Sequence, residues 1–380
     1  MDKVKTAIIG IGFIGAVHIE SLRRLGFVDI IAICDPLEAD KKATFHHIEL
    51  AYYDYKKMIG EIDIDFLHIC TPNNTHFEIA SYAIERNINV VLEKPMAVTL
   101  EEAETLVKMA EKKKVIAAIN FHNRLYPAIH FLKNQISTGA LGKIISVNGA
   151  YLQDWLLYDT DYSWRLISRE SGKTRAIADI GSHWIDLVEY TTGLQVSEVM
   201  AEFRTVHKER MKPLSAIQTF SKEKSVEYEN IPIDTEDMAS IILRFSNGAI
   251  GNCFISQMFS GKKNKIQLFV AGTEASAQWD LDDSNNLEIG YRNSPNKIIT
   301  KDALLMGEKT ADIISYPPGH SEGFADAIKQ NFKQIYKKYA NRELPSDFAT
   351  FKDGLREMII CERIFESARK EQFIKIEREG

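Results

Sequence analysis

Three glycines near the start of the chain occur in the segment Gly10-Ile-Gly-Phe-Ile-Gly15, between an apolar, β-branched run and a stretch of helical periodicity. In such a turn the first glycine permits a tight bend, the second lets the backbone approach a phosphate, and the third lets the helix pack on the strand. The amino end of the helix then offers N–H groups and a positive dipole to the phosphates. The pattern predicts a dinucleotide-binding loop made of Gly10, Gly12, Phe13, Ile14 and Gly15.

Asp35 follows Gly15 by about 20 residues, at the end of the next apolar run, where dinucleotide-binding folds place an acidic residue against the ribose. Its carboxylate can accept hydrogen bonds from both ribose hydroxyls, which suits NAD. A 2′-phosphate at about 4 Å would meet a like charge, at a cost of up to about 4 kcal/mol for an effective dielectric of ~20. NAD is therefore the expected cofactor and NADP the less favoured one, although Lys41 and Lys42 could offset part of this charge.

Polar clusters follow three later apolar runs, and ligands of open parallel sheets bind beyond such strand ends. The clusters are Thr71-Pro-Asn-Asn-Thr-His76, Glu93-Lys94-Pro95 and Asn120-Phe-His-Asn-Arg124. One cluster could be a helix cap, but three in successive loops outline a site. The peptide bond before Pro95 is either cis or trans, because proline allows both. The candidate cofactor contacts are Thr71, Pro72, Asn73, His76, Glu93, Lys94 and Asn120.

Asp179 and His183 are four residues apart at the start of a predicted helix, so both side chains fall on one face. An ordinary imidazole, with a pKa of about 6.5, can accept a hydroxyl proton at neutral pH, whereas an ordinary lysine, with a pKa of about 10.4, is charged. We therefore expect His183 to be the general base and Asp179 to orient it. Lys94 is expected to polarise the reacting oxygen, and it is the alternative base if burial lowers its pKa. Asp186 is a second possible partner of His183.

These residues need a scaffold, and the first 120 or so residues alternate short apolar strands with helices, as in a parallel sheet covered on both faces. Strands are expected at Val4–Ile9, Val28–Cys34, Phe66–Cys70, Val90–Leu92 and Val115–Ile119. Helices are expected at Ala16–Leu25, Glu38–Glu49, Thr75–Arg86 and Leu100–Lys113. Thr99 and Glu102 form a capping box that fixes the start of the last helix.

From about Ile144 the pattern becomes a meander of strands followed by two long helices. Strands are expected at Ile144–Gln153, Glu198–Val206, Met238–Phe245, Ala249–Phe259, Lys265–Ala271, Ala275–Leu281 and Leu287–Tyr291. Helices are expected at Gly181–Thr192, Glu322–Tyr339 and Asp347–Lys370. Asn247-Gly248 predicts a hairpin, and the charged stretch His207–Ile233 is expected to be a mobile surface excursion.

The composition argues against several other classes of protein. The chain has 47 basic and 53 acidic residues, a net charge of −6 and no long basic stretch, so nucleic acid is not an expected partner. No apolar run approaches the ~20 residues that span a bilayer, so no membrane partner is expected. The four cysteines are far apart in apolar segments, which excludes a Cys-x-x-Cys metal or redox site and suits reduced thiols in the cytoplasm. No metal site is predicted.

At these motifs the sequence resembles the glucose–fructose oxidoreductase / inositol dehydrogenase family (Gfo/Idh/MocA), with a further match at Asp179-Ile-Gly-Ser-His183-Trp-Ile-Asp186. The resemblance implies an α/β fold, with a Rossmann NAD-binding domain at residues 1–121 and an α+β domain at residues 122–380. The second domain would have a large, mostly antiparallel sheet that forms the floor of the substrate site and often the interface of a homodimer or homotetramer. The family's catalytic residues correspond to Lys94, Asp179 and His183.

The resemblance further implies NAD(P)-dependent oxidation or reduction of a sugar, polyol or related secondary alcohol. Aromatic and polar side chains crowd residues 153–165, where they are either core or a sugar-recognition surface. Arg165 matches a family position that approaches the cofactor. Lys173 and Arg175 stand where many relatives have glycines, which motivates the hypothesis of an anionic sugar. The candidate substrate contacts are Lys94, Arg124, Gln153, Asp154, Trp155, Asp179 and His183.

Two other functions are compatible with the same residues. Redox-assisted glycoside cleavage would reduce and reoxidise a tightly held NAD within one cycle, without net NADH. A non-enzymatic NAD sensor would keep the glycine loop but would not need the three catalytic residues. For the subunit contact, strands such as Ile266–Val270 look apolar enough to meet a partner.

Overall fold

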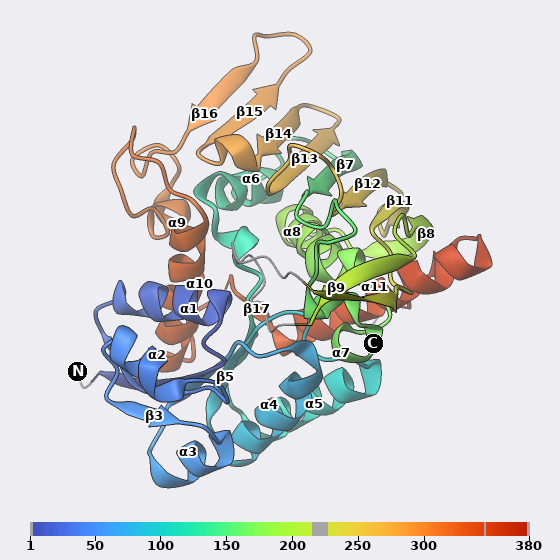
Figure 1. The fold of residues 1–380 in the computed structure, drawn as a ribbon. Helices are drawn as coiled ribbons and strands as arrows, with labels where there is room; N and C mark the ends of the chain where they lie inside the picture. Colours follow the sequence, from blue (N-terminus) through green and yellow to red (C-terminus); the bar gives the residue numbers. More distant parts are fainter. Residues whose placement is uncertain (1–2, 215–226, 346, 378–380) are drawn as a thin grey trace. The chain divides into compact units, whose positions relative to one another are not determined.

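The computed structural model describes residues 3–214, 227–345 and 347–377, and the chain divides into two compact units (Figure 1). The first unit is Met1–His122 with Phe324–Arg356, and the second is Asn123–Gly323 with Glu357–Gly380. The predicted division, between residues 121 and 122, lies one residue earlier than this one, and it does not include the return of residues 324–356 to the first unit.

The first unit contains a seven-stranded sheet in the order β17-β6-β5-β4-β1-β2-β3. Its strands are β1 Val4–Ile9, β2 Val28–Cys34, β3 Leu50–Tyr52, β4 Phe66–Ile69, β5 Asn89–Leu92, β6 Ala117–Ile119 and β17 Ala349–Thr350. All pairs are parallel except β17 with β6. The sequence predicts the strands that lie centrally, which are continuous apolar runs, and it misses the three-residue β3.

The helices of the first unit are α1 Phe13–Arg23, α2 Ala39–Phe45, α3 Tyr55–Glu61, α4 His76–Glu85, α5 Leu100–Lys113 and α10 Phe324–Ala340. The predicted bounds of α5 are confirmed, and so is its capping box between Thr99 and Glu102. The sequence does not predict α3, whose seven residues are too few to show a helical period. Its N-cap Asp54 accepts a hydrogen bond from the N–H of Lys57.

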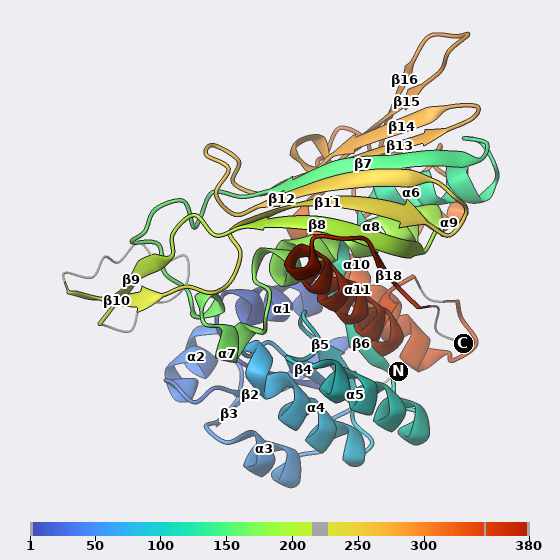
Figure 2. The ribbon, with the colours of Figure 1, turned by 90° about the vertical axis from the view of Figure 1, so that its right-hand side faces the viewer.

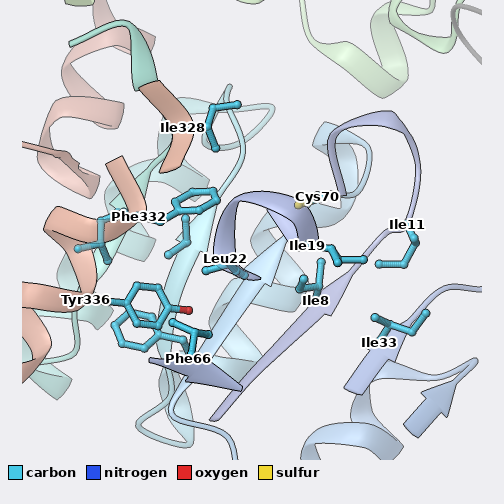
Figure 3. Packing of buried hydrophobic residues seen from close by; sticks show 14 of the residues in the cluster. Ile8, Ile11, Ile19, Leu22, Ile33, Phe66, Cys70, Ile328, Phe332 and Tyr336 are labelled. Carbon is cyan, nitrogen blue, oxygen red and sulfur yellow. The ribbon is translucent and has the colours of Figure 1, made fainter. Parts of the chain in front are cut away.

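Helix α10 belongs to the first unit because its apolar face completes the core under the parallel sheet. Phe332 and Tyr336 of α10 are fully buried in the cluster that holds Leu22 of α1 and Phe66 of β4 (Figure 3). The rings of Phe66 and Tyr336 are stacked with centroids 4.3 Å apart. Burying side chains of this size stabilises a fold by about 1.5–3 kcal/mol each, which is why the C-terminal segment returns.

The second unit contains a nine-stranded sheet in the order β16-β15-β14-β13-β7-β12-β11-β8-β18. Its strands are β7 Ile144–Leu152, β8 Val196–Arg204, β11 Met238–Phe245, β12 Ile250–Ser256, β13 Lys265–Gly272, β14 Ser276–Asp280, β15 Asn286–Gly290, β16 Lys297–Thr300 and β18 Ile374–Lys375. Only β7 with β12 is parallel among these described pairs, so the mostly antiparallel sheet is confirmed. The Asn247-Gly248 hairpin joins β11 to β12 as predicted.

One face of this sheet packs against helices, as Figure 2 shows for α8 and α11. The helices that accompany the sheet are α6 Pro127–Ser137, α7 Ser168–Ser171, α8 Ser182–Thr192, α9 Glu308–Ala311 and the later part of α11 Phe351–Lys370. The burial of β11 alternates along the strand, which is the mark of a sheet with one covered and one open face.

The stretch predicted as a mobile surface excursion, His207–Ile233, contains regular structure in its described residues. It forms an antiparallel pair, β9 Glu209–Pro213 and β10 Tyr228–Pro232, whereas residues 215–226 lie outside the described residues. The charge-rich composition concealed a buried guanidinium, Arg210, which anchors β9 to the rest of the unit.

Candidate functional site

The glycine loop in the first unit has the geometry that a pyrophosphate needs. Gly10 has a φ of +85°, and a Cβ there would lie 2.8 Å from the carbonyl of Cys70. A Cβ at Gly15 would lie 2.1 Å from the carbonyl oxygen of Gly10, whereas a Cβ at Gly12 would meet no atom within 4 Å. Helix α1 begins next to Gly12 with no side-chain cap and no acidic residue in its first turn. The loop therefore fits an anion at the amino end of α1.

Asp35 directly follows β2, beside this loop, and is buried. Its Oδ2 accepts a hydrogen bond from the N–H of Ile11 at 2.7 Å, and its Oδ1 accepts one from the N–H of Leu37 at 2.8 Å. Lys42 Nζ lies 2.8 Å from Oδ2, so the nearby cation considered above does pair with the carboxylate. The carboxylate is therefore fixed in place at the position where a dinucleotide's ribose binds in this fold.

His76 joins two of the polar loops that the sequence singles out. Its Nδ1 lies 2.9 Å from the carbonyl oxygen of Pro95 and its Nε2 lies 2.9 Å from that of Thr71. Burial lowers the pKa of His76, against the opposing effect of these two carbonyls. The Lys94–Pro95 peptide bond is cis. The neighbouring residues Pro72 and Asn73 begin the turn before α4, in which Asn73 is buried.

Glu93 lies at the centre of a buried polar network that sequence reasoning only partly found. Its Oε1 accepts hydrogen bonds from His18 Nε2 at 2.9 Å and from Asn120 Nδ2 at 2.6 Å. Burial acts to raise the pKa of Glu93, but the hydrogen bonds from His18 and Asn120 and the charge of Lys94 outweigh it and lower this pKa to about 2. His18 was not predicted as a site residue, although its place one turn before Leu22 on the buried face of α1 was visible.

In the second unit, Asp179 lies in a π-helical turn, Ile177–Gly181, that runs directly into α8. The prediction of a helix start here is correct, but the wider π turn has no signal in the sequence; such turns are frequent at functional sites. The carboxylate of Asp179 accepts a hydrogen bond from Gln257 Nε2 at 2.8 Å, and Arg165 Nε lies 3.5 Å from its other oxygen. Gln257 is fully buried and was not predicted.

His183 is a buried residue in the first turn of α8. The next residue, Trp184, fixes the helix on the sheet, because its indole N–H donates to the carbonyl of Gln267 in β13 at 2.9 Å. The ring centroid of Tyr151 in β7 lies 6.5 Å from that of His183. The hydroxyl of Tyr151 in turn donates to Asn264 Oδ1 at 2.8 Å.

Three predicted substrate contacts follow β7 and are ordered by hydrogen bonds. Gln153 Nε2 donates to Asn264 Oδ1 at 2.9 Å and Trp155 Nε1 donates to Gln153 Oε1 at 2.8 Å, so these side chains continue the chain that begins at Tyr151. Asp154 turns elsewhere, because its Oδ2 pairs with Lys263 Nζ at 2.8 Å and ties down the loop after β12.

Arg124, predicted as a substrate contact, is held inside the second unit. Its guanidinium makes a two-pronged ion pair with the carboxylate of Asp186 on α8, and both side chains are buried. Asp186, the second possible partner predicted for His183, forms this ion pair with Arg124. The pair holds α8 in place, and it leaves little of the Arg124 charge for a ligand.

The hypothesis that Lys173 and Arg175 attract an anionic sugar is wrong for Arg175. This side chain is 0 % exposed and ion-paired with Asp237. Lys173 is 62 % exposed and pairs with Glu362 at 2.7 Å. Lys173 and Arg175 thus stand where many relatives have glycines, but each is paired with an acidic residue of the same unit.

The sequence leaves open whether the aromatic residues between β7 and α7 are core residues or a sugar-recognition surface, and the structure places them in different surroundings. Trp155 and Tyr162 pack against a small apolar cluster that contains Leu156, so they are in part core residues. Tyr158 is largely exposed. Trp164 stacks under the guanidinium of Arg165, with 4.6 Å from the carbon atom to the ring centroid.

Residues 4–121 match the model of a family described as an oxidoreductase family with an NAD-binding Rossmann fold, and residues 129–278 match the GFO/IDH/MocA C-terminal domain. The chain belongs to the Gfo/Idh/MocA family. It is therefore an oxidoreductase that uses NAD, and the glycine loop and Asp35 described above are the parts of this Gfo/Idh/MocA chain that fit the cofactor.

Several relatives match this Gfo/Idh/MocA protein over long stretches. A levoglucosan dehydrogenase of Pseudarthrobacter phenanthrenivorans is 28% identical over 393 residues, which covers 99% of each chain. A myo-inositol 2-dehydrogenase of Thermotoga maritima is 25% identical over 252 residues, covering 65% of this chain and 67% of the relative. The structure of a levoglucosan dehydrogenase in complex with NADH and L-sorbose superposes with a TM-score of 0.89 and 25% identity, covering 100% of both chains.

Two absences concern the residues that the structure describes. No helix among them is both long and apolar enough to cross a bilayer. No three His, Cys, Asp or Glu side chains in this part of the chain are gathered as the ligands of a metal ion would be.

Proposed function

We propose that the protein is an NAD-dependent dehydrogenase that oxidises a secondary alcohol of a sugar or polyol, with His183 as the general base. The observation that carries the proposal is the arrangement of Asp179 and His183 on one continuous helical segment, with the Asp179 carboxylate fixed by Arg165 and Gln257. The relatives named as levoglucosan and inositol dehydrogenases support the substrate class.

The chemistry follows from what each residue can do. His183 takes the proton of the hydroxyl as the carbon–oxygen double bond forms. Asp179 keeps a negative charge in the same segment, which stabilises the imidazolium that results. Lys94 donates a hydrogen bond to the reacting oxygen and draws charge from it, as a cation placed where negative charge develops. When bound, NAD supplies the acceptor for the hydride that leaves the same carbon.

Several other predicted site residues have supporting roles in this proposal. Gln153 and Trp155 present an ordered amide and an aromatic face, a combination that suits a sugar ring. Arg165 is paired with Asp179, and we propose that it also borders the cofactor, as the family resemblance implies. The cofactor contacts proposed in the first unit are Gly10, Gly12, Phe13, Ile14, Gly15, Asp35, Thr71, Pro72, Asn73, His76, Glu93, Lys94 and Asn120.

A panel of sugars and polyols incubated with NAD, with NADH followed by absorbance, tests the function. We expect net NADH with at least one compound and a loss of about 10²–10⁴-fold in kcat when His183 is replaced by alanine. Added imidazole should restore part of the activity of His183→Ala if this residue is the base. Lys94→Ala should respond to small amines instead if lysine is the base. His47→Ala, which changes an exposed imidazole in the first unit, is the control.

The alternative functions give different results in the same panel. Redox-assisted glycoside cleavage would release a sugar from a glycoside without net NADH. A sensor would bind NADH and turn over none of the compounds. Either result would reject the dehydrogenase.

We also propose that the protein assembles as a homodimer or homotetramer through the open face of the large sheet. The contact residues differ from those expected from the sequence. Ile266, Leu268 and Val270 were expected to meet a partner subunit, but they are buried on the covered face of the sheet and so are not a contact surface. Ile242 and Ile250 are exposed on alternate positions of β11 and β12. Light scattering of the wild type and of Ile250→Glu tests this, since a charge at the interface should lower the mass.

A cytoplasmic location is part of the proposal. It is supported by the four cysteines, all of which are free, because thiols persist in reducing compartments. Fractionation of cells that produce the protein, followed by detection of the chain, tests the location.

A further inference from the structure

Two consecutive acidic residues, Glu236 and Asp237, are buried just before β11 and have no part in the chemistry proposed above. Glu236 is 3% exposed and Asp237 is 0% exposed. Buried carboxylates are costly unless their oxygens are satisfied, so their partners show what the two residues are for.

The carboxylate of Glu236 caps the segment that carries the catalytic pair. Its two oxygens accept the N–H of Arg175 at 2.9 and 3.1 Å, and Oε1 also accepts the N–H of Ile177 at 2.8 Å. Ile177 begins the π-helical turn that contains Asp179 and leads into the helix of His183. The first N–H groups of a helical segment have no partner inside it, and a carboxylate there both satisfies them and complements the dipole.

The carboxylate of Asp237 holds two guanidinium groups. Its Oδ1 is paired with Arg175 Nη2 and, at 2.9 Å, with Arg210 Nη2. Its Oδ2 accepts the N–H of Val206 at 2.6 Å. The cluster of Glu236, Asp237, Arg175 and Arg210 thus contains two carboxylates and two guanidinium groups, and its formal charges balance.

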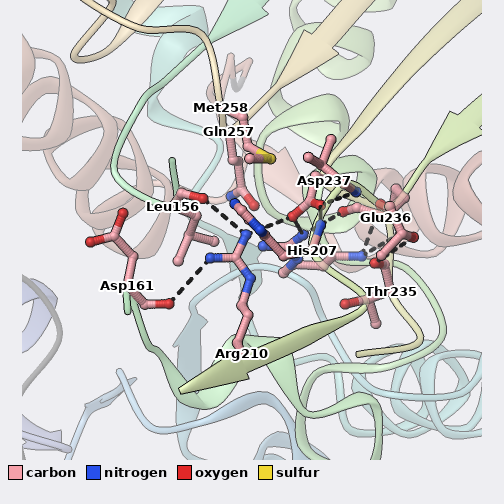
Figure 4. Close-up of polar contacts among 12 residues, drawn as sticks. Leu156, Asp161, His207, Arg210, Thr235, Glu236, Asp237, Gln257 and Met258 are labelled. Carbon is pink, nitrogen blue, oxygen red and sulfur yellow. Dashed lines mark hydrogen bonds and ion pairs between the residues drawn. The ribbon is translucent and has the colours of Figure 1, made fainter. Parts of the chain in front are cut away.

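Arg210 extends this cluster to the loop that follows the predicted substrate contacts. Its guanidinium donates to the carbonyls of Leu156 at 2.9 Å and Asp161 at 3.3 Å (Figure 4). It also donates to the carbonyl of Tyr158 at 2.7 Å. Residues 156–161 directly follow Gln153 and Trp155. Three carbonyls on one rigid cation leave this loop little freedom.

Gln257 connects the cluster to Asp179, since its main chain is hydrogen-bonded to the cluster and its side chain to the Asp179 carboxylate. Its N–H donates to the carbonyl of Asp237 at 3.1 Å, and its own carbonyl accepts the N–H of Leu156 at 3.3 Å. The amide of the same residue donates to Asp179 at 2.8 Å. The backbone of the cluster therefore sets the position of the group that orients Asp179.

We propose that Glu236 and Asp237 form a positioning clamp, in which Glu236 fixes the Asp179–His183 segment and Asp237, through Arg210, fixes the loop 156–161 that borders the substrate. This inference rests on the proposed function, because it assigns positioning residues for that reaction. It explains why a basic residue, Arg175, stands shortly before Asp179: Arg175 supplies a main-chain N–H to Glu236 and a guanidinium to Asp237.

Three variants test the clamp. Glu236→Ala removes the cap, and we expect kcat to fall about 10- to 100-fold with an unchanged Kd for NADH, since small displacements of catalytic groups have effects of this size. Glu236→Gln retains an amide oxygen that can accept both N–H groups, and it should keep kcat within about threefold of the wild type. Arg210→Gln should raise KM about tenfold with little change in kcat. Glu202→Ala, at an exposed position of β8, is the control.

Amide hydrogen exchange measures the same clamp without relying on turnover. Glu236→Ala should speed exchange in residues 174–183 at least tenfold, and Glu236→Gln should not. Unchanged exchange in Glu236→Ala, or faster exchange with an unchanged kcat, overturns the clamp. If the wild type oxidises no sugar or polyol, the proposed function fails, and exchange alone then decides whether Glu236 caps the segment. If Glu236→Ala does not fold, equal kcat and KM for wild type and Arg210→Gln overturns the role of Asp237.

Discussion

The imidazole of His18 and the carboxylate of Glu93 form a buried pair in the first unit, with Nε2 2.9 Å from Oε1. Asn120 donates to the same oxygen at 2.6 Å. The pair joins helix α1, which starts at the glycine loop, to the residue that directly precedes Lys94. The same hydrogen bonds therefore hold both the helix that follows the glycine loop and the residue next to Lys94.

This pair predicts a pH dependence of stability. Burial opposes ionisation of Glu93, but its hydrogen bonds prevail and lower its pKa from 4.5 to about 2. A lowered folded-state pKa contributes stability that is fully present above about pH 4.5 and is lost as the pH falls toward 2. The shift corresponds to a contribution on the order of 3 kcal/mol. Urea unfolding of the wild type and Glu93→Gln between pH 6 and about 3 measures it.

In that comparison the free energy of unfolding of Glu93→Gln should depend less steeply on pH, by up to about 1.4 kcal/mol per pH unit. Glu20→Gln, which alters an exposed carboxylate on α1, should follow the wild type. Parallel curves for the wild type and Glu93→Gln would show that this carboxylate is not held in its charged form.

The geometry of the glycine loop predicts that two similar substitutions affect different properties: one lowers the stability of the first unit and the other lowers the affinity for NADH. A methyl group at position 15 would collide with the backbone of Gly10, so Gly15→Ala should destabilise the first unit by about 1–3 kcal/mol. A methyl group at position 12 meets open space, so Gly12→Ala should change stability by less than about 1 kcal/mol. The same methyl group would obstruct the pyrophosphate and weaken NADH binding about tenfold or more.

Thermal unfolding and a titration of NADH fluorescence separate the two effects. An unstable Gly12→Ala that still binds NADH normally would contradict the assignment of this loop.

The sequence predicts the parts of the fold whose signals are local. Apolar runs and the glycine spacing predict the central strands of the first unit, and the capping box predicts α5, because each depends on residues within one or two turns. The return of α10 was not predicted, since its amphipathic face could pack on either unit. Residues 324–356 join the first unit through contacts with side chains such as Phe66, about 270 positions away in sequence.

In the candidate site, too, local motifs are predictable from the sequence and long-range contacts are not. Lys94, Asp179 and His183 are recognisable from motifs, but the groups that support them are not. Gln257 directly follows β12 and Glu236 lies just before β11, far along the chain from Asp179, and neither residue belongs to a recognisable sequence motif. The burial of Arg175 was likewise not predictable, because the sequence around a cation does not show whether a distant carboxylate such as that of Asp237 neutralises it.

Asp35 and Lys42 predict how cofactor choice responds to mutation. Lys42 is paired with Asp35 at 2.8 Å, so neutralising the carboxylate removes the repulsion toward a 2′-phosphate and also frees a cation nearby. Asp35→Asn should therefore raise the ratio of kcat/KM for NADP to that for NAD about tenfold or more. Lys42→Ala should lower this ratio, because the negative charge is left unbalanced. Equal ratios in the two variants would show that Asp35 does not face the ribose.

Lys173 and Arg175 give the last prediction, which separates a surface charge from a structural one. Arg175 is buried against Asp237, and removing one partner of a buried ion pair costs about 3–5 kcal/mol, so Arg175→Met should lower the free energy of unfolding by this amount. Lys173 is exposed, and its pair with Glu362 should contribute less than about 1 kcal/mol.

Neither Lys173 nor Arg175 should set a preference for charge in the substrate. Lys173→Ala should therefore change kcat/KM for a neutral polyol and for the matching uronate by the same factor, which steady-state kinetics with NAD can measure. A selective loss of uronate turnover in Lys173→Ala would mean that this lysine leaves Glu362 to bind substrate, and the anionic-sugar hypothesis would then hold for one of its two cations.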